Sequence, residues 1–209
     1  MYIFGAQLQA KPGRGGELSA GLGALREAVS AAIGRPAYAW AVATGAPTGA
    51  FALSTRMEGT GDLIDSLMAV NTNEGYQKAA AALGDHLAAP SQTNWFQVVG
   101  TAGDVGEPKQ VTVVTTATVA TGQMSAAMGW CTEMMEYAAG LTGSGTMLTS
   151  AAGGSFFDVA FIGGFDSGQA ADAANDAVAA DAGYIERIDQ AGDLFVNGSA
   201  SRMVMVQLP

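Results

Sequence analysis

Apolar residues recur early in the chain with the spacing of an amphipathic helix. They follow one another at steps of 4, 3, 4 and 4 residues, which places them on one helical face. A glycine-rich segment after Pro12 precedes them, and Gly34-Arg35-Pro36 provides a stop signal. The pattern predicts a helix over about residues 16–33. The residues of this stripe are Leu18, Leu22, Leu25, Val29 and Ile33.

The same stripe returns 106 residues later, at Met124, Met128, Cys131 and Met135. Further on, the run that ends at Tyr76 (Asn-Glu-Gly-Tyr) matches the run that ends at Tyr184 (Asp-Ala-Gly-Tyr) at an offset of 108. Self-similarity at a fixed offset indicates an internal repeat. We therefore interpret the chain as a tandem duplication, with a small insertion near Gly163-Gly164. The predicted organisation is a first repeat at 1–103, a linker at 104–109 and a second repeat at 110–209.

Each half is predicted to contain the elements βαββαβ. In the first half we expect strands at 2–10, 37–44, 50–58 and 93–100, and helical regions at 16–33 and 60–86. In the second half we expect strands at 110–120, 146–151, 155–163 and 201–208, and helical regions at 122–140 and 167–191. This order is that of the ferredoxin-like unit. Its sheet carries helices on one face, so the other face needs a cover, which a second copy supplies.

In element order, repeat length and internal similarity, nearly the whole chain resembles the dimeric α+β barrel superfamily, in a fused form with both halves in one chain. The resemblance implies an α+β fold: two tandem ferredoxin-like βαββαβ units with antiparallel sheets packed into an α+β barrel. Members of the superfamily include quinone-forming monooxygenases without cofactor, haem-degrading monooxygenases, lactone isomerases and stress-induced proteins. Their pockets lie between sheet and helices or inside the barrel.

The function that the resemblance implies is a soluble small-molecule-binding or stress-associated module. The alternative is a cofactor-independent monooxygenase or isomerase that acts on a flat hydrophobic small molecule. Haem-degrading relatives carry a histidine on the second helix, an asparagine on the first strand and a tryptophan near that helix. Here His86 lies late in the second helical region, but the first strand offers Gln7 or Gln9 and no asparagine. We predict no cofactor and no bound metal.

Three ionisable residues are candidates for catalysis. Asp158 and Arg56 lie within strand-like runs, where a buried charge needs a partner. If Asp158 faces inward, burial raises its pKa and suits it to act as a base. An edge position or a pairing with Arg56 or Arg202 is the alternative. His86 is the third candidate, and its alternative is a surface histidine near a helix end.

Aromatic residues on strands are the candidates for substrate binding. Tyr38 and Trp40 alternate with alanines along one strand, so the large side chains share one face. Phe51, Trp95 and Phe156 are expected to join them. Such a wall suits a flat apolar ligand. A plain packed barrel core is the alternative.

Other residues of the repeats are expected to pack. Asn73 and Asp181 are helix-start signals, and Tyr76 and Tyr184, three residues after them, are predicted to anchor the second helix of each half. The methionines of the second half are read as core filling. Trp130 and Met134 fall off the apolar stripe of their helix, which predicts a second buried face, such as an interface between copies of the chain. A homo-oligomer is therefore expected.

Composition narrows the range of functions. Hydrophobic residues make up 49% and charged residues 13%, which excludes a disordered chain. No apolar run reaches the ~18 residues of a membrane-spanning helix.

The formal charge of −10, with 9 basic residues, argues against nucleic acid and anionic membranes as partners. A lone Cys131 and a single histidine cannot form a disulfide or a Cys/His zinc site within one chain. Without a secretory leader, we expect a cytoplasmic protein.

Overall fold

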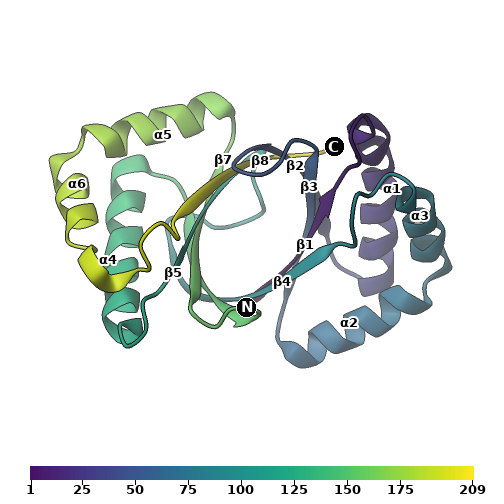
Figure 1. Cartoon of the computed structure of the whole chain (residues 1–209), viewed down its shortest axis with the longest axis horizontal. Helices are drawn as coiled ribbons and strands as arrows, with labels where there is room; N and C mark the ends of the chain where they lie inside the picture. Colours follow the sequence, from purple (N-terminus) through teal and green to yellow (C-terminus); the bar gives the residue numbers. More distant parts are fainter. The chain divides into compact units, whose positions relative to one another are not determined.

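The computed structural model describes residues 1–209 and contains eight strands, six α-helices and one 3-10 turn. The strands are hydrogen-bonded in the order β1-β3-β2-β8-β5-β7-β6-β4, which closes into a barrel. The predicted fold class, two ferredoxin-like βαββαβ units in an α+β barrel, is confirmed (Figure 1).

Two compact units divide the chain. The first comprises Met1–Phe96 and Val206–Pro209, and the second comprises Gln97–Met205. Strands β4 (Gln92–Ala102) and β8 (Ser201–Gln207) therefore contribute residues to both units. The boundaries of the two sequence repeats stay a prediction, because a compact unit need not coincide with a repeat.

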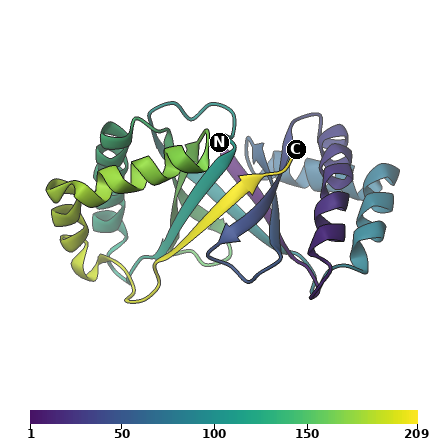
Figure 2. The ribbon, with the colours of Figure 1, turned by 90° about the horizontal axis from the view of Figure 1, so that it is seen from above.

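Three helices cover one face of the sheet in the first unit. Helices α1 and α3 lie side by side, as Figure 2 shows. Their close approach depends on Gly21, where a Cβ atom would lie 2.3 Å from Cδ2 of Leu83. The elements are β1 (Tyr2–Gln9), α1 (Gly15–Ile33), β2 (Ala37–Thr44), β3 (Ala50–Met57), α2 (Thr60–Thr72) and α3 (Glu74–Gly84).

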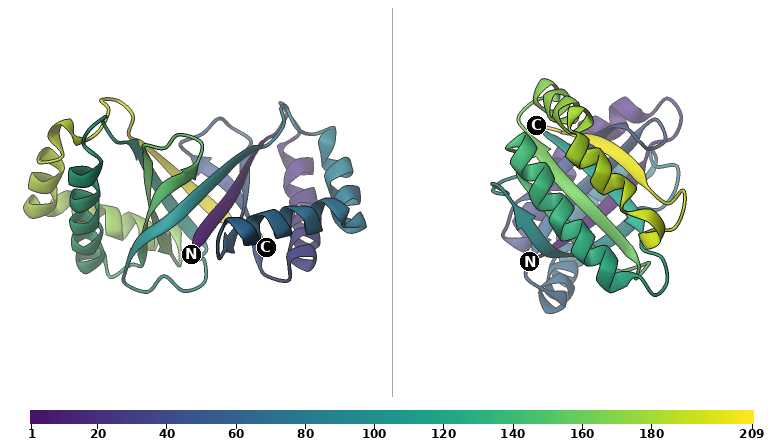
Figure 3. Two further views of the ribbon diagram at one scale, coloured as in Figure 1. Left: turned by 90° about the horizontal axis from the view of Figure 1, so that it is seen from below. Right: turned by 90° about the vertical axis from the view of Figure 1, so that its left-hand side faces the viewer.

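The second unit repeats this arrangement, with its helices on one face of its sheet (Figure 3, right). Helix α4 takes the place of α1, and both helices end at a glycine with positive φ, Gly34 at 68° and Gly143 at 65°. The elements are β5 (Val111–Thr118), α4 (Met124–Thr142), β6 (Thr146–Gly153), β7 (Asp158–Phe165), α5 (Gly168–Ala180), α6 (Ala182–Asp189) and the 3-10 turn η1 (Gly192–Leu194).

The second helical region of each half is interrupted once, where the sequence predicts one continuous stretch. Asn73 separates α2 from α3, and its Oδ1 accepts a hydrogen bond from the Tyr76 amide at 2.9 Å. Asp181 separates α5 from α6 and accepts from the Tyr184 amide at 2.7 Å. Both residues are N-caps, as the sequence predicts, but each cap starts a new helix because its own backbone is extended (ψ of 117° and 113°).

The predicted apolar stripes form the cores of the two units. In the first unit, Leu18 and Leu22 are fully buried with Ala39 of β2 and Phe51 of β3. In the second unit, the corresponding cluster contains Cys131 of α4. Because Ala39 and Phe51 face these helices, strand alternation turns the neighbouring residues to the opposite face of the sheet.

Trp130 is half-buried and Met134 is buried within the second unit, so the predicted second buried face is present but gives no support for an interface between copies. The Trp130 ring packs edge-on against Phe195, with ring centroids 5.4 Å apart. Its indole N–H donates to the Arg187 carbonyl at 2.8 Å, and Met134 is 4% exposed. Residues of α6 and of the segment after it contact Trp130 on this second face of α4, so no partner copy is needed to account for it. None of the six α-helices could span a membrane.

Candidate functional site

An aromatic and polar cluster lies on the face of the first sheet that is opposite its helices. The pairing of β2 with β3 places Tyr38 opposite Ser54 and Trp40 opposite Ala52. Alternation places Arg56 on the same face, because its neighbours Thr55 and Met57 are buried on the helical side. The cluster therefore joins two predicted substrate-binding residues, Tyr38 and Trp40, with one predicted catalytic residue.

The contacts within this cluster fix the indole ring. Trp40 is 3% exposed, and its Nε1–H donates to Ser54 Oγ at 2.9 Å. A buried indole N–H needs such a partner. The Tyr38 ring lies 6.5 Å from the Trp40 ring at an angle of 43°. Tyr38 and Arg56 are half-buried. The face thus offers aromatic surface, a hydroxyl and a cationic side chain where access of water is restricted.

Two predicted members of the aromatic wall lie elsewhere. Phe51 is 7% exposed and belongs to the helical core, so its placement beside Tyr38 and Trp40 was wrong. Its register partner on β2 is Ala41, on the alanine face of that strand. Trp95 stacks on Tyr2, with ring centroids 4.8 Å apart at 7°.

Tyr2 pairs with Met57, and Met57 is buried beside Ser66 of α2. The stacked pair of Trp95 and Tyr2 therefore belongs to the helical side of the first sheet. The sequence does not reveal this placement of Trp95. Because β4 is far from β2 in the sequence, the alternation within β4 cannot show which side chain Trp95 will contact.

Asp158 begins β7, on the face of the second sheet opposite its helices. Its Oδ1 accepts a hydrogen bond from Thr118 Oγ1 at 2.7 Å, and the two residues are register partners. Strand alternation places it with Ala160, as the sequence predicts. The alternative partner Arg202 instead donates to Asn175 Oδ1 of α5.

Phe156 lies in the turn before β7 and is 71% exposed. The predicted strand begins at residue 155, but the observed strand begins three residues later, so Phe156 has no place on a strand face. Its ring packs edge-on against Phe157, which itself contacts the core of the second unit.

His86 lies in the turn after α3, two residues beyond the end of that helix. Its backbone joins α3 to β1, since its amide donates to the Leu83 carbonyl at 2.9 Å and its carbonyl accepts from the Lys11 amide at 2.8 Å. Its Nδ1 atom is buried without a hydrogen-bond partner. The imidazole is thus on the helical side and is separate from the Tyr38–Trp40 cluster.

A second polar cluster connects α4 with α6 in the second unit. The Tyr137 hydroxyl donates to Asp181 Oδ1 at 2.8 Å, and the Arg187 guanidinium lies 3.9 Å from the centre of the Tyr137 ring. Gly183 permits this contact, because a Cβ there would lie 2.4 Å from the Tyr137 oxygen. The hydrogen bond from Tyr137 lowers the pKa of Asp181 and raises that of Tyr137. An open depression of ≈ 550 Å³ beside the cluster is lined by Glu133, Glu136, Tyr137, Gly140, Leu141 and Arg187.

This cluster predicts a pH-dependent effect of Tyr137→Phe. The variant keeps the ring under Arg187 and removes the hydroxyl, so the folded-state pKa of Asp181 rises toward its ordinary value. A carboxyl with a lowered folded-state pKa stabilises the fold above its unfolded pKa and loses that contribution as the pH falls through the folded value. We expect the variant to melt a few degrees below the wild type near neutral pH, with the difference vanishing in acid.

Thermal melting from neutral to acid pH tests this expectation, with Glu136→Gln on the rim of the depression as the matched control. A difference in melting temperature that stays constant down to the most acidic pH would show that Asp181 is not the group involved. The sequence does not reveal this cluster, since the first repeat has Ala31 and Ala79 at the positions of Tyr137 and Arg187.

No protein-family model matches the sequence, and no curated protein matches it. Solved structures do match. A proposed monooxygenase from Fusobacterium nucleatum superposes with a TM-score of 0.71 at 10% identity, covering 100% of this chain and 92% of that chain. A proposed monooxygenase from Lactobacillus acidophilus gives 0.66 at 12% identity, with 100% and 94% covered. An anthrone oxidase-like protein gives 0.65 at 14% identity, with 98% and 90% covered.

The chain shares the fold of these three structures. At these identities the likeness concerns the fold alone. The chemistry has to be argued from the residues of this chain. Sequence reasoning missed Ser54 and Thr118, which hold Trp40 and Asp158 in place. Each of them lies directly opposite a candidate residue on the neighbouring strand, Ser54 opposite Tyr38 and Thr118 opposite Asp158. That position is the signal that could have identified them.

Proposed function

We propose that this chain is a small-molecule-binding α+β barrel, which holds a flat apolar ligand on the face that carries Tyr38, Trp40 and Arg56. The observation that carries the proposal is the convergence of two aromatic rings, a serine hydroxyl and a guanidinium on one shielded sheet face. Binding sites for small molecules combine mostly apolar walls with a few polar groups that orient the ligand.

The aromatic rings and the guanidinium favour different features of a ligand. The aromatic rings favour a planar ligand, because stacked or edge-on ring contacts add to the burial of apolar area. Arg56 favours a ligand with a carbonyl or enolate oxygen, to which a guanidinium donates charge-assisted hydrogen bonds. A polycyclic ketone such as anthrone has both features, and a relative with this fold is described as anthrone oxidase-like.

Binding is tested by titrating the protein with anthrone and following tryptophan fluorescence. We expect saturable quenching by the wild type. Arg56→Gln should weaken binding about tenfold, since a hydrogen bond from a charged group contributes roughly 1.5–3 kcal/mol. Arg14→Gln, which removes an exposed arginine paired with Glu17 at the start of α1, is the matched control and should bind like the wild type. Equal affinity of Arg56→Gln and wild type would contradict the proposed site.

The alternative function is a cofactor-independent monooxygenase acting on the same class of ligand. In that reaction a base removes a proton from the methylene carbon of anthrone and leaves an enolate. Molecular oxygen is the oxidant: one oxygen atom becomes the new carbonyl and the other leaves as water with the two hydrogens of the methylene. Asp158 is the proposed base, because its carboxylate is oriented by Thr118 on a sheet face.

Oxygen uptake with anthrone decides between the two functions. Oxidation to anthraquinone without added cofactor, lost in Asp158→Asn while anthrone still binds, would support the enzyme. Saturable binding without oxygen uptake would support the binding module. An isomerase, a stress-associated role and the cytoplasmic location stay predictions.

A further inference from the structure

An arginine of α6 faces the open depression of the second unit with most of its hydrogen-bond donors unpaired. The half-buried guanidinium of Arg187 lies over the Tyr137 ring, 3.9 Å from the ring centre. Its Nη1 atom donates to the Gly183 carbonyl at 2.9 Å, and it forms no ion pair with a carboxylate. A guanidinium carries five N–H groups in a planar fork. Arg187 therefore retains N–H groups that can bind an acceptor from outside the chain.

Two glutamates of α4 line the same depression as Arg187. Glu133 and Glu136 are exposed, and their spacing places them on one side of the helix together with Tyr137. Neither glutamate forms an ion pair, although a guanidinium lines the same depression. Charges of opposite sign thus surround a space of ≈ 550 Å³ without touching one another. This arrangement leaves room between them for a ligand that carries both signs of charge.

The contacts of Tyr137 hold Arg187 in this position. The Tyr137 hydroxyl donates to Asp181 at the start of α6, and the absent side chain of Gly183 lets the ring approach that helix. A guanidinium that turned toward the glutamates would lose its cation–π contact with the ring. The first unit has alanine in place of both Tyr137 and Arg187, so the ferredoxin-like fold does not require this pair. The fixed arginine is therefore a specialisation of the second unit.

The depression also contains an apolar patch with room above it. Leu141 is half-buried, and Gly140 beside it contributes no side chain. A Cβ atom at Gly140 would meet nothing within 4 Å, so the space over this residue is open. The depression consequently combines a cation, two carboxylates and an apolar patch that an aliphatic group can cover.

We propose that this depression binds a zwitterionic amino acid with an aliphatic side chain. The ligand carboxylate accepts charge-assisted hydrogen bonds from Arg187, whose planar fork matches the two carboxylate oxygens. The ligand ammonium group donates to Glu133 and Glu136, and the aliphatic side chain covers Leu141. A simple anion would face two unpaired glutamates, and a simple cation would face the arginine, so the charges of the depression select against both.

The first test uses L-leucine and two analogues that each lack one charged group. The protein is titrated near neutral pH, and binding is followed by the NMR shifts of its backbone amides. We expect leucine to cause saturable shifts in α4 and α6. Isocaproate lacks the ammonium group and isoamylamine lacks the carboxylate, so each should bind about tenfold more weakly, because a charge-assisted hydrogen bond is lost. The absence of saturable shifts with leucine, or equal affinity for leucine and the amine, would overturn the proposal.

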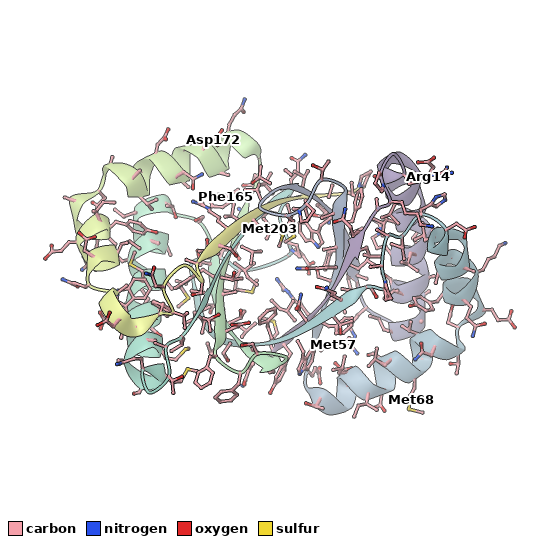
Figure 4. All side chains as sticks on the ribbon, in the orientation of Figure 1. Arg14, Met57, Met68, Phe165, Asp172 and Met203 are labelled. Atoms are coloured by element: carbon pink, nitrogen blue, oxygen red, sulfur yellow. The ribbon has the colours of Figure 1, made fainter.

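The second test pairs each variant with the analogue that lacks the matching group. Arg187→Gln should weaken leucine binding about tenfold but should not weaken isoamylamine binding, because the amine has no carboxylate for Arg187 to bind. The double variant Glu133→Gln, Glu136→Gln should weaken leucine binding but not isocaproate binding. Asp172→Asn removes an exposed carboxylate on the outer side of α5 (Figure 4) and is the matched control, which should bind leucine like the wild type. A variant that weakens leucine and its matching analogue equally would show that the residue does not contact the missing group, and the proposal would fail.

A third variant blocks the depression without changing its charge. Gly140→Leu places a side chain in the open space beside Leu141 and should abolish leucine binding. The control is Gly129→Leu, because Gly129 lies about three helical turns away on α4, outside the depression, and a Cβ there also meets nothing within 4 Å. Thermal melting checks that both variants are folded, and leucine binding by folded Gly140→Leu would contradict the proposed position of the ligand.

These tests are independent of the binding function proposed above. They use no anthrone, and they concern residues of the second unit, whereas the Tyr38–Trp40 cluster lies on the sheet of the first unit. Failure of one proposal therefore leaves the other in place.

Discussion

Gly145→Ala is expected to destabilise the protein by about 3 kcal/mol or more. Gly145 lies between α4 and β6 and is buried. A Cβ atom there would be 1.7 Å from the Asp104 carbonyl oxygen and 2.4 Å from its carbon. These are backbone atoms, so no change of rotamer can relieve the overlap, and the segment after β4 would have to move. The neighbouring Gly103 has a positive φ of 68° and approaches the Ser144 carbonyl. The backbone of residues 103–104 is therefore tightly packed against that of residues 144–145.

Urea unfolding of Gly145→Ala measures this cost, and Gly129→Ala is the matched control. Gly129 is an exposed glycine inside α4 where an added Cβ meets nothing within 4 Å. Alanine there should stabilise the protein by about 1 kcal/mol, because glycine is a poorer helix former. If both variants unfold at the same urea concentration, the close approach of Asp104 to Gly145 is not part of the native structure.

The repeat could be predicted from the sequence because both copies retain the features that shape the backbone. The helix stripe, the terminal glycine of the first helix and the N-cap before Tyr76 and Tyr184 are local signals with fixed spacing. The break within each second helical region could have been read from the same caps, since Asn73 and Asp181 sit inside the predicted helices. The close approach of the linker backbone to Gly145 could not be predicted from the sequence. It brings together backbone atoms about forty residues apart, and a periodic pattern of residues gives no information on such a contact.

The candidate site was predicted in part, for a related reason. Alternation within one strand correctly groups Tyr38 with Trp40 and Asp158 with Ala160. It cannot say which face a residue of another strand shares, because that depends on the register between strands. Phe51 pairs with Ala41 rather than with a residue of the Tyr38 face, and a shift of one residue would have reversed this.

The two copies also differ in where their first helix is buried, and this predicts unequal costs for equivalent substitutions. In α1 the deepest residues, Leu18 and Leu22, are fully buried. At the matching places of α4, Met124 and Met128 are half-buried, and burial is deepest at Ala127 and Cys131. The sequence stripe is the same in both helices, so the difference comes from what packs on them.

Leu22→Ala should therefore cost about 3 kcal/mol, within the range of roughly 2–5 kcal/mol for a fully buried leucine. Its neighbours α3 and β3 cannot close the cavity without losing the contact of Leu83 with Gly21. Met128→Ala at the equivalent position should cost about 1 kcal/mol, because its side chain already contacts solvent and leaves a smaller void. Urea unfolding of the two variants compares the copies directly. Equal losses of unfolding free energy would mean that the place of a residue in the apolar stripe alone sets its contribution to stability. Unequal losses would show that the two copies bury different parts of the same helical pattern.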